Sequence, residues 1–412
     1  MEGYLSSIVS AIRSGDGDSL KNLFALPVPK LEMDAFAGQL SGKSVEALEN
    51  ECRSQLSGLD GHLSAVVVAR LAALGALSAG NYDEAYKHIH SAYNGIVDYI
   101  SGPGSGSSGF LTSAFVQVVG DLRQVACIAD RAKPQRERLS NPCLRESQNS
   151  ITRGFTLVKK DRKPLEDPNS RKRTIFAVTN VLFKIYFKLN TLQLCGKLIN
   201  LVETRDTMDN LTMFPVSDVV MYKYYVGRLK MFEDRYEDAR ECFRFSLKHC
   251  PQRCTHNRRL ILSSLVPIEM VLGVMPTQKV ADLYNLHILV ELGQAVKKGD
   301  LRAFNTIVAT NRANFIHQGI YLVVEQLKAI VFRNLFKRIH KITESTRLSV
   351  VTFQSVLKML GEDMELDEIE CILSNLIFKN IVKGYLSHQK RIMVIGKSDP
   401  FPTTSIVKKQ KI

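Results

Sequence analysis

The residues that could form a metal centre lie close together near the middle of the chain. His249, Cys250, Cys254 and His256 fall within one short segment, and thiolate and imidazole are ligands that zinc prefers. Their spacing matches no zinc finger, however, and all of them would come from a single turn. Cys242 and Cys250 also have the spacing of small core residues in the preceding helix. We therefore interpret these cysteines as structural and expect no metal.

Catalytic patterns are equally weak. Gly42–Ser44 and Gly396–Ser398 each read Gly-Lys-Ser, but a phosphate-binding loop needs a glycine five residues before its Gly-Lys pair, and Ala37 stands there in the first case. His88 and His90 are two apart on a predicted helix and point to different faces. No HExxH, GxSxG or paired-carboxylate pattern is present. The sequence predicts a protein that is not an enzyme and has no cofactor.

The basic residues give a clearer pattern. The formal net charge is +14, which favours a polyanionic partner. Arg333, Lys337 and Lys341 are spaced i, i+4, i+8 along a predicted helix, with Arg338 beside them. Further basic residues follow near the C-terminus: Lys383, His388, Lys390, Arg391 and Lys397. Together they predict a surface that neutralises phosphates and releases counterions; a solvated helix face is the alternative.

Helical periodicity dominates the segments that must position these residues, and strand alternation is confined to the last ~65 residues. Apolar helices separated by glycine-containing or polar turns recur at 64–100, 229–250 and 292–315. Such hairpins are typical of tetratricopeptide-like units that stack into a solenoid. The segment 101–109, SGPGSGSSG, is expected to be a flexible loop, and the basic, proline-containing segment 131–173 a long exposed connection.

The C-terminal part has a different order. A helix over 319–342, a short extended piece, two helices and two short strands around a turn predict a winged helix with a small β-wing. We therefore predict an all-α fold, a helical solenoid that ends in a winged helix. The expected divisions are helical repeats over 1–130, the connection 131–173, further repeats over 174–318, the winged helix 319–397 and a basic tail 398–412.

The predicted helix over 366–380 limits how nucleic acid could be read. A sequence-reading winged helix inserts the N-terminal end of this helix into the major groove. Here that end is acidic: Glu362, Asp363, Glu365, Asp367, Glu368 and Glu370. Phosphates would be repelled from it, so we expect contact with the nucleic-acid backbone through the wing and the basic stripe, and no base readout.

The chain also resembles a known family. The combination of helical repeats and winged helix resembles the PCI domain, which the proteasome lid, the COP9 signalosome and an initiation-factor complex share. The segments MYKYYVGRLKMFEDRYEDARECF and NRRLILSSLVPIEMVLGVMPT resemble one branch in particular. That branch contains the PCI subunit of the nuclear-pore-associated transcription-and-export complex (the second TREX complex) and its signalosome-like relatives. The likeness covers roughly 170–400.

The resemblance implies a nuclear scaffold subunit in mRNA export, which pairs with a large PCI-domain protein and binds RNA or DNA jointly with it. It also implies a small acidic, disordered partner that wraps the repeats. A basic set lies on the helices that resemble this wrapping site: Lys223, Arg228, Lys230, Arg240, Arg244, Lys248, Arg258 and Arg259. A solvated face is again the alternative for this set.

Two other roles are compatible with the sequence. The chain could instead be a PCI subunit of a signalosome-like complex in protein turnover, which purification of its partners would distinguish. It could also be a tetratricopeptide-type adaptor that binds a peptide and no nucleic acid, in which case reversing the charge of Lys390 and Arg391 would leave binding unchanged.

One segment has the pattern of a nuclear localisation signal. Basic pairs or triplets flank a ten-residue spacer, the spacing of a bipartite nuclear localisation signal: Lys159, Lys160, Arg171, Lys172 and Arg173. A solvated loop or direct RNA contact would explain them as well. The eight cysteines are scattered, no stretch approaches the ~18 apolar residues of a membrane span, and no signal peptide is recognisable. We expect reduced thiols in a soluble protein of the nucleus, near the nuclear pore, and partly of the cytoplasm.

Overall fold

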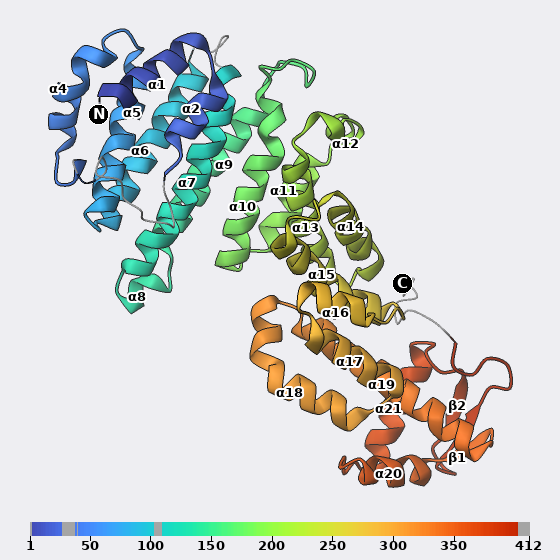
Figure 1. Ribbon diagram of the computed structural model, residues 1–412. Helices are drawn as coiled ribbons and strands as arrows, with labels where there is room; N and C mark the ends of the chain where they lie inside the picture. The colour runs from blue at the N-terminus through green and yellow to red at the C-terminus, as the bar shows by residue number, and fades with distance from the viewer. Residues whose placement is uncertain (1, 27–37, 39, 103–108, 403–412) are drawn as a thin grey trace. The chain divides into compact units, whose positions relative to one another are not determined.

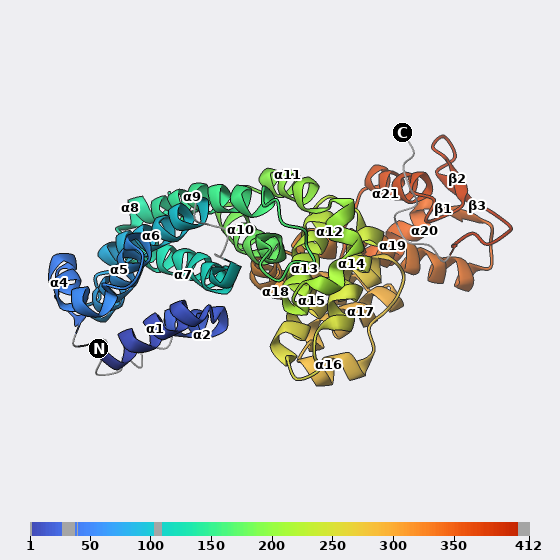
Figure 2. The same cartoon turned by 90° about the horizontal axis from the view of Figure 1, so that it is seen from above.

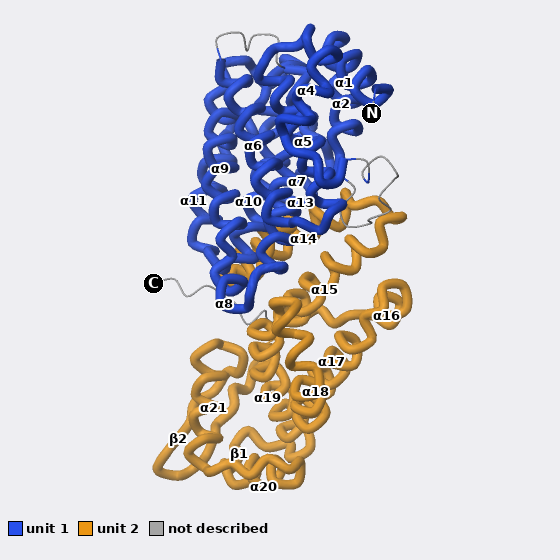
Figure 3. The backbone as a smooth tube through the Cα atoms, turned by 90° about the vertical axis from the view of Figure 1, so that its left-hand side faces the viewer, with its two compact units in different colours: residues 1–222 blue, residues 223–412 orange. Residues whose placement is uncertain are grey.

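The computed structural model describes residues 2–26, 38, 40–102 and 109–402. The chain forms two compact units, residues 1–222 and 223–412 (Figure 3). The helix α13 (Val216–Phe232) begins in the first unit and ends in the second.

Unit 1 is built from helices. They are α1 (Glu2–Ser14), α2 (Gly17–Phe24), α4 (Val45–Leu56), α5 (Gly61–Ser78), α6 (Tyr82–Ser101), α7 (Leu111–Ala132), α8 (Gln135–Arg138), α9 (Pro142–Lys159), α10 (Ile175–Leu189), α11 (Gln193–Val202) and α12 (Arg205–Asp209), with short 3₁₀ turns η2 (Arg171–Thr174) and η3 (Leu211–Met213). Each of α5, α6, α7, α9 and α10 packs on the helix before or after it in this series (Figure 1).

The predicted first hairpin is confirmed as α5 and α6, joined by Gly80 in the left-handed conformation (φ 73°). By length and composition alone, the helix α5 could cross a membrane, whereas the sequence predicted no membrane-spanning segment. In this structure α5 is a core helix, because it packs between α4 and α6 and most of its side chains are buried.

A buried ion pair ties α5 to α7. The Arg70 guanidinium donates to the Asp121 carboxylate at 2.7 Å, and both residues are almost wholly buried. The ring of Phe24 in α2 lies 5.2 Å from the Arg70 guanidinium, and Gln117 donates to the second Asp121 oxygen. Burial raises the pKa of Asp121 to about 6 despite the nearby Arg70. Burial disfavours the charged form of this carboxylate, and the Arg70 charge opposes that effect.

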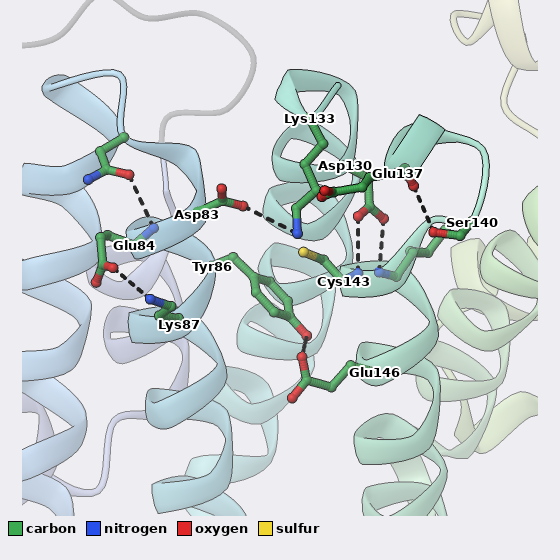
Figure 4. A network of polar contacts seen from close by, with 12 residues as sticks. Asp83, Glu84, Tyr86, Lys87, Asp130, Lys133, Glu137, Ser140, Cys143 and Glu146 are labelled. Atoms are coloured by element: carbon green, nitrogen blue, oxygen red, sulfur yellow. Dashed lines mark hydrogen bonds and ion pairs between the residues drawn. The ribbon is translucent and has the colours of Figure 1, made fainter. Parts of the chain in front are cut away.

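The predicted exposed connection over 131–173 is wrong for residues 142–159, which form the long helix α9. Both Asp130 oxygens accept hydrogen bonds from the first α9 amides, Cys143 and Leu144, each at 3.0 Å. The Tyr86 hydroxyl of α6 donates to Glu146 at 2.9 Å (Figure 4). These bonds hold α9 against α6 and α7. Residues 160–170, between α9 and η2, are irregular.

Unit 2 contains the remaining helices and all the strands of the described residues. These are α14 (Tyr236–His249), α15 (Thr255–Val271), α16 (Gln278–Tyr284), α17 (His287–Lys298), α18 (Leu301–Gln318), α19 (Tyr321–Thr343), β1 (Arg347–Ser349), α20 (Val350–Met359), α21 (Leu366–Phe378), β2 (Gly384–Ser387) and β3 (Ile392–Ile395). The pairs α13–α14 and α17–α18 are the other two predicted hairpins.

The winged helix has the predicted order of elements. The strands form an antiparallel sheet in the order β1-β3-β2, and Figure 2 shows this sheet beside α20 and α21. Leu357, Ile369 and Leu373 are buried between the helices and the sheet. The predicted fold class, an all-helical solenoid that ends in a winged helix, is therefore confirmed.

Other predictions about chain segments have mixed outcomes. Residues 398–402 do not belong to a tail, because Phe401 is buried and Pro402 lies beside it. The rest of the predicted tail, and most of the predicted loop 101–109, lie outside the described residues. The proposed divisions at 130, 173 and 318 do not coincide with the limit of the compact units at 222 and stay predictions.

Six of the eight cysteines are buried thiols as expected, whereas Cys254 is half-buried and Cys371 exposed.

The Arg70–Asp121 pair generates a test of unit 1. We expect Asp121→Ala to lower the free energy of unfolding by about 3–5 kcal/mol, because it leaves the Arg70 guanidinium buried without its counter-charge. Urea unfolding followed by circular dichroism measures this. Replacing both residues, Arg70→Met with Asp121→Leu, should restore much of the loss. Lys87→Gln, which removes an exposed pair with Glu84, serves as the control, and equal stability of this control and Asp121→Ala would contradict the prediction.

Candidate nucleic-acid interface

The helix α19 positions the predicted basic stripe. One side of α19 is apolar and packs on α15, α17 and α18. Gly299 makes this close packing possible, because a Cβ there would lie only 2.4 Å from the Leu335 backbone nitrogen. The Asn334 side chain donates to the Val296 carbonyl at 2.7 Å. The opposite edge of α19 carries Lys337 and Lys341, and that edge is the candidate site.

Arg333 does not belong to the exposed stripe, contrary to the sequence prediction. Its Nη2 donates to the Phe401 carbonyl at 2.6 Å and to the Pro402 carbonyl at 2.9 Å, and Nη1 donates to Asn334. The guanidinium is partly buried, and burial lowers its pKa. Arg333 therefore anchors the segment 396–402, called the strap below, to α19.

The strap brings residues distant in sequence to the edge of α19. The Lys383 amide donates to the Pro400 carbonyl at 2.8 Å, and the Gly396 amide donates to the Lys383 carbonyl at 2.9 Å. The Lys383 ammonium lies 3.8 Å from the Asp399 carboxylate. Burial, then Arg333 and then Lys341 lower the pKa of Lys337, while Asp399 opposes them. We call Lys337, Lys341 and Lys383, with the strap carboxylate Asp399, the stripe cluster.

Arg338 also has a structural role that the spacing did not reveal. Its Nη1 donates to the carbonyl of Lys298, the last residue of α17, at 3.0 Å. Cations at this position complement the unpaired carbonyls at a helix C-terminus. Lys341 and Lys397 are exposed, and neither forms an ion pair with another described residue. Of the predicted residues on and near α19, Lys341 and Lys397 are exposed, Lys337 is half-buried, and both arginines bond to main chain.

The basic residues of the wing are held by the acidic helix α21. The Arg391 guanidinium lies 2.6 Å from Asp367 and 3.6 Å from Glu370. His388 Nδ1 lies 2.6 Å from the same Glu370. We call these residues the wing clasp. Of the predicted wing residues, Lys390 is exposed at the turn and makes no ion pair with another described residue.

Glu370 differs from the sequence expectation. The carboxylates at the start of α21 were predicted to point outward, yet the Glu370 side chain is only 8% exposed. The wing clasp explains this, because a buried carboxylate needs opposite charge and hydrogen-bond donors. Glu365 and Glu368 form a reciprocal capping box at the α21 N-terminus. The entrance of this helix is thus acidic and already capped.

The predicted single basic surface is divided in two by the β2–β3 hairpin. Gly384 pairs with Ile395 at the open end of the hairpin, beside Lys383 and the strap. Ser387 pairs with Ile392 at its turn, beside His388 and Arg391. The stripe cluster and the wing clasp therefore lie at opposite ends of the hairpin. Only the stripe cluster has more cations than carboxylates.

The second basic set of unit 2, on α13 to α15, is also partly structural. Arg244 pairs with Glu269 at 2.6 Å. Arg258 donates to the Leu247 and Cys250 carbonyls and to the Tyr284 hydroxyl. Arg228 donates to the Gln318 carbonyl. The remaining members stay predictions: Lys223, Lys230, Arg240, Lys248 and Arg259.

A shallow depression marks this surface. Arg244, Lys248, His249 and Arg258 line it, together with the turn after α14. Its charged lining residues are all cations, which suits an acidic ligand. The His249 ring also packs against Phe245 in a tilted arrangement, with ring centroids 4.4 Å apart.

The predicted localisation residues occupy ordered positions. Lys159 is the last residue of α9, Lys160 follows it, and Arg171, Lys172 and Arg173 form η2. The Arg171 amide donates to the Asp161 carboxylate at 2.7 Å. All three η2 side chains are half-buried. Their role in localisation stays a prediction.

One arrangement has the geometry of a nucleophile and base. His90 Nε2 lies 2.7 Å from Ser150 Oγ, and His90 Nδ1 lies 3.7 Å from Glu146. Ser150 is nearly buried in the middle of α9, where the backbone amides bond within the helix and cannot serve as an oxyanion hole. We assign these residues to α6–α9 packing. Among the described residues, no group of three His, Cys, Asp or Glu side chains could hold a metal ion.

The strap yields a testable prediction. We expect Arg333→Ala to speed amide exchange at Lys383 by about tenfold or more, because hydrogen bonds from a charged donor to carbonyls contribute about 1.5–3 kcal/mol. Hydrogen exchange measured by NMR tests this. Lys341→Ala, about two helical turns further along α19 and without a hydrogen bond to the strap carbonyls, should leave exchange unchanged. Equal exchange in the Arg333 variant and the wild type would show that Arg333 does not anchor the strap.

Comparison with known proteins agrees with this architecture. The PCI domain model matches residues 308–397, from α18 to just after β3. PCI domain-containing protein 2 of Danio rerio is 32% identical over 406 residues, 98% of each chain. Its Dictyostelium discoideum homologue is 29% identical over 404 residues, 98% of this chain and 92% of the relative. Protein CSN12 homolog of Neurospora crassa is 33% identical over 295 residues, 67% and 64% of the two chains.

PCI-domain proteins are in general non-catalytic scaffold subunits that assemble with other PCI proteins in multi-subunit complexes. The match extends over nearly the whole of this chain, and the winged helix described above lies within the matched domain. The chain therefore belongs to the PCI domain-containing protein 2 family.

Proposed function

We propose that this PCI-family subunit is an adaptor of a nuclear mRNA-export and transcription-coupled complex, and that it grips the RNA or DNA backbone through its winged helix. The stripe cluster is the observation that supports this proposal most directly. Three lysines from α19 and the start of β2 converge there with one carboxylate. Lysine ammonium groups bind phosphates as point charges and confer no sequence preference.

The wing clasp supports a mode of binding without base readout. Asp367 and Glu370 of α21 already engage Arg391 and His388 of the wing, so these two wing residues are paired with carboxylates at the N-terminal end of α21. A duplex that approached this end would also meet the carboxylates of Glu362 and Asp363. Contacts between phosphates and residues outside α21 would position the nucleic acid instead.

Two protein partners belong to the proposal. A larger PCI-domain protein would pair with the winged helix, as PCI proteins assemble with one another in general. A small acidic disordered protein would lie on the basic surface of α13 to α15, where Lys248 and Arg244 line the depression. Attraction of opposite charges would speed its association and make it sensitive to salt. The proposed location is the nucleus, near the nuclear pore, with some protein in the cytoplasm.

The alternative is a PCI subunit of a signalosome-like complex in protein turnover. Its fold would be the same, since a shared fold does not determine function. The stripe cluster favours the nucleic-acid role, because three lysines with one counter-charge suit a chain of phosphates.

Charge removal at the stripe cluster tests nucleic-acid binding. We expect the variant Lys337→Gln, Lys341→Gln and Lys383→Gln to bind single-stranded RNA and duplex DNA at least about tenfold more weakly at low salt, with a salt dependence reduced by about 0.7 per lost phosphate contact on single strands. Fluorescence anisotropy across a salt series measures both quantities.

A matched control separates this effect from net charge. Lys297→Gln, Lys358→Gln and Lys379→Gln remove the same charge from exposed positions of unit 2 outside the cluster. This control should bind almost as the wild type does. If the two triple variants weaken binding equally, the stripe cluster is not the interface.

The partners are tested by purification. We expect the tagged protein, isolated from nuclear extract with and without nuclease, to retain a large PCI-domain protein and a small acidic protein in both cases, because helical packing and charge complementarity hold them. Mass spectrometry identifies them. Recovery of ubiquitin-pathway PCI subunits in their place would contradict the export role and support the alternative.

A further inference from the structure

Asp399 occupies an unusual position within the stripe cluster. Its carboxylate lies 3.8 Å from the Lys383 ammonium, and it acts electrostatically on Arg333 and on Lys337 as well. Among the described residues, it is the only carboxylate that Arg333, Lys337 and Lys383 share. A single acidic residue thus faces cations from both α19 and the wing.

The backbone at this position is held from both sides. Asp399 has φ 39°, in the left-handed region that residues other than glycine seldom adopt. The next residue accepts a hydrogen bond from the Lys383 amide, and Phe401 is buried and held by Arg333 through its carbonyl. The Phe401 ring also packs against His340, with centroids 5.8 Å apart. These anchors fix the strap and direct Asp399 to the cluster.

The charges of the cluster do not cancel. Lys337, Lys341 and Lys383 carry three positive charges, and Asp399 supplies one negative charge. The separation of 3.8 Å and the exposure of both side chains of the Asp399–Lys383 pair mean that the pair adds little to stability. The Asp399–Lys383 pair contributes little to folding, yet the strap fixes the Asp399 carboxylate among cations that suit phosphates. An effect on binding explains this position better than an effect on stability.

We propose that Asp399 occupies a phosphate position of the stripe cluster and acts as a built-in competitor of the nucleic-acid backbone. This inference rests on the proposed function. A phosphate that binds between Lys337 and Lys383 displaces the Asp399 carboxylate or lies beside it at an electrostatic cost. Asp399 thereby weakens binding to polyanions of low charge density and sets the affinity of the site.

Asp399→Asn tests this inference. Asparagine has nearly the same shape as aspartate and also tolerates the left-handed backbone conformation, but it carries no charge. A fluorescein-labelled oligouridylate of about twenty nucleotides is the probe. We expect about fivefold tighter binding than in the wild type at low salt, and a salt dependence steeper by about 0.7 for one additional phosphate contact. Amide exchange at Lys383, measured alongside, should be unchanged if the strap stays in place.

Two controls make the result specific. Asp363→Asn removes one exposed negative charge from the same winged helix outside the cluster and should tighten binding by less than about twofold, as screened charges do at distance. In a Lys337→Gln background, the gain from Asp399→Asn should disappear, because the two residues share one phosphate position.

The outcomes separate the inference from the function on which it rests. Equal effects of Asp399→Asn and Asp363→Asn, or a gain that persists without Lys337, would overturn the competitor role while leaving nucleic-acid binding intact. Absence of binding by both the wild type and Asp399→Asn would overturn the proposed function and this inference together.

Discussion

The packing of α19 is the interaction on which unit 2 depends. Its apolar side covers α15, α17 and α18, and Phe336 extends the same core to Phe353 of α20, with ring centroids 4.7 Å apart. The helical repeats and the winged helix therefore share one helix and one continuous core. Because buried side chains fix the rotation of α19 about its axis, they also fix which residues remain at its outer edge. The position of the stripe cluster is a consequence of this packing.

The helical hairpins and the winged helix could be predicted because their signals are local. Apolar residues recur at helical spacing, and Gly80 and Gly299 mark the turns with positive φ. The helix α9 was missed because its buried side includes Ser147, Ser150 and Gly154, which carry no hydrophobic signal. The Ser147 hydroxyl donates to the Cys143 carbonyl within the helix. The cap from Asp130 comes from another helix, so the sequence of α9 itself could not indicate it.

The candidate site could be predicted only in part, for a similar reason. Spacing along α19 placed Lys337 and Lys341 on one edge of the helix, but it also assigned Arg333 to the exposed stripe, whereas Arg333 binds the strap carbonyls. It could not show that the strap returns to this face, because that depends on Phe401 being buried 68 residues after Arg333 in the chain. Nor could it show that Arg391 meets Asp367 across the winged helix. Charge patterns report which residues share a face, whereas pairing depends on tertiary contacts.

A division between arginine and lysine follows from these contacts. Arg338, Arg228 and Arg258 each donate to a carbonyl at or near the C-terminal end of another helix: Lys298 of α17, Gln318 of α18 and Leu247 of α14. The planar guanidinium can satisfy several such acceptors at once and is less strongly hydrated than an ammonium group. Helix C-termini are also the negative ends of the helix dipoles. These three guanidinium groups keep their charge, but their geometry is fixed by main-chain acceptors, so they contribute to the net charge of +14 without being free to reorient toward a partner. The lysines of the stripe cluster make no such main-chain bond among the described residues, and their ammonium groups stay near the surface.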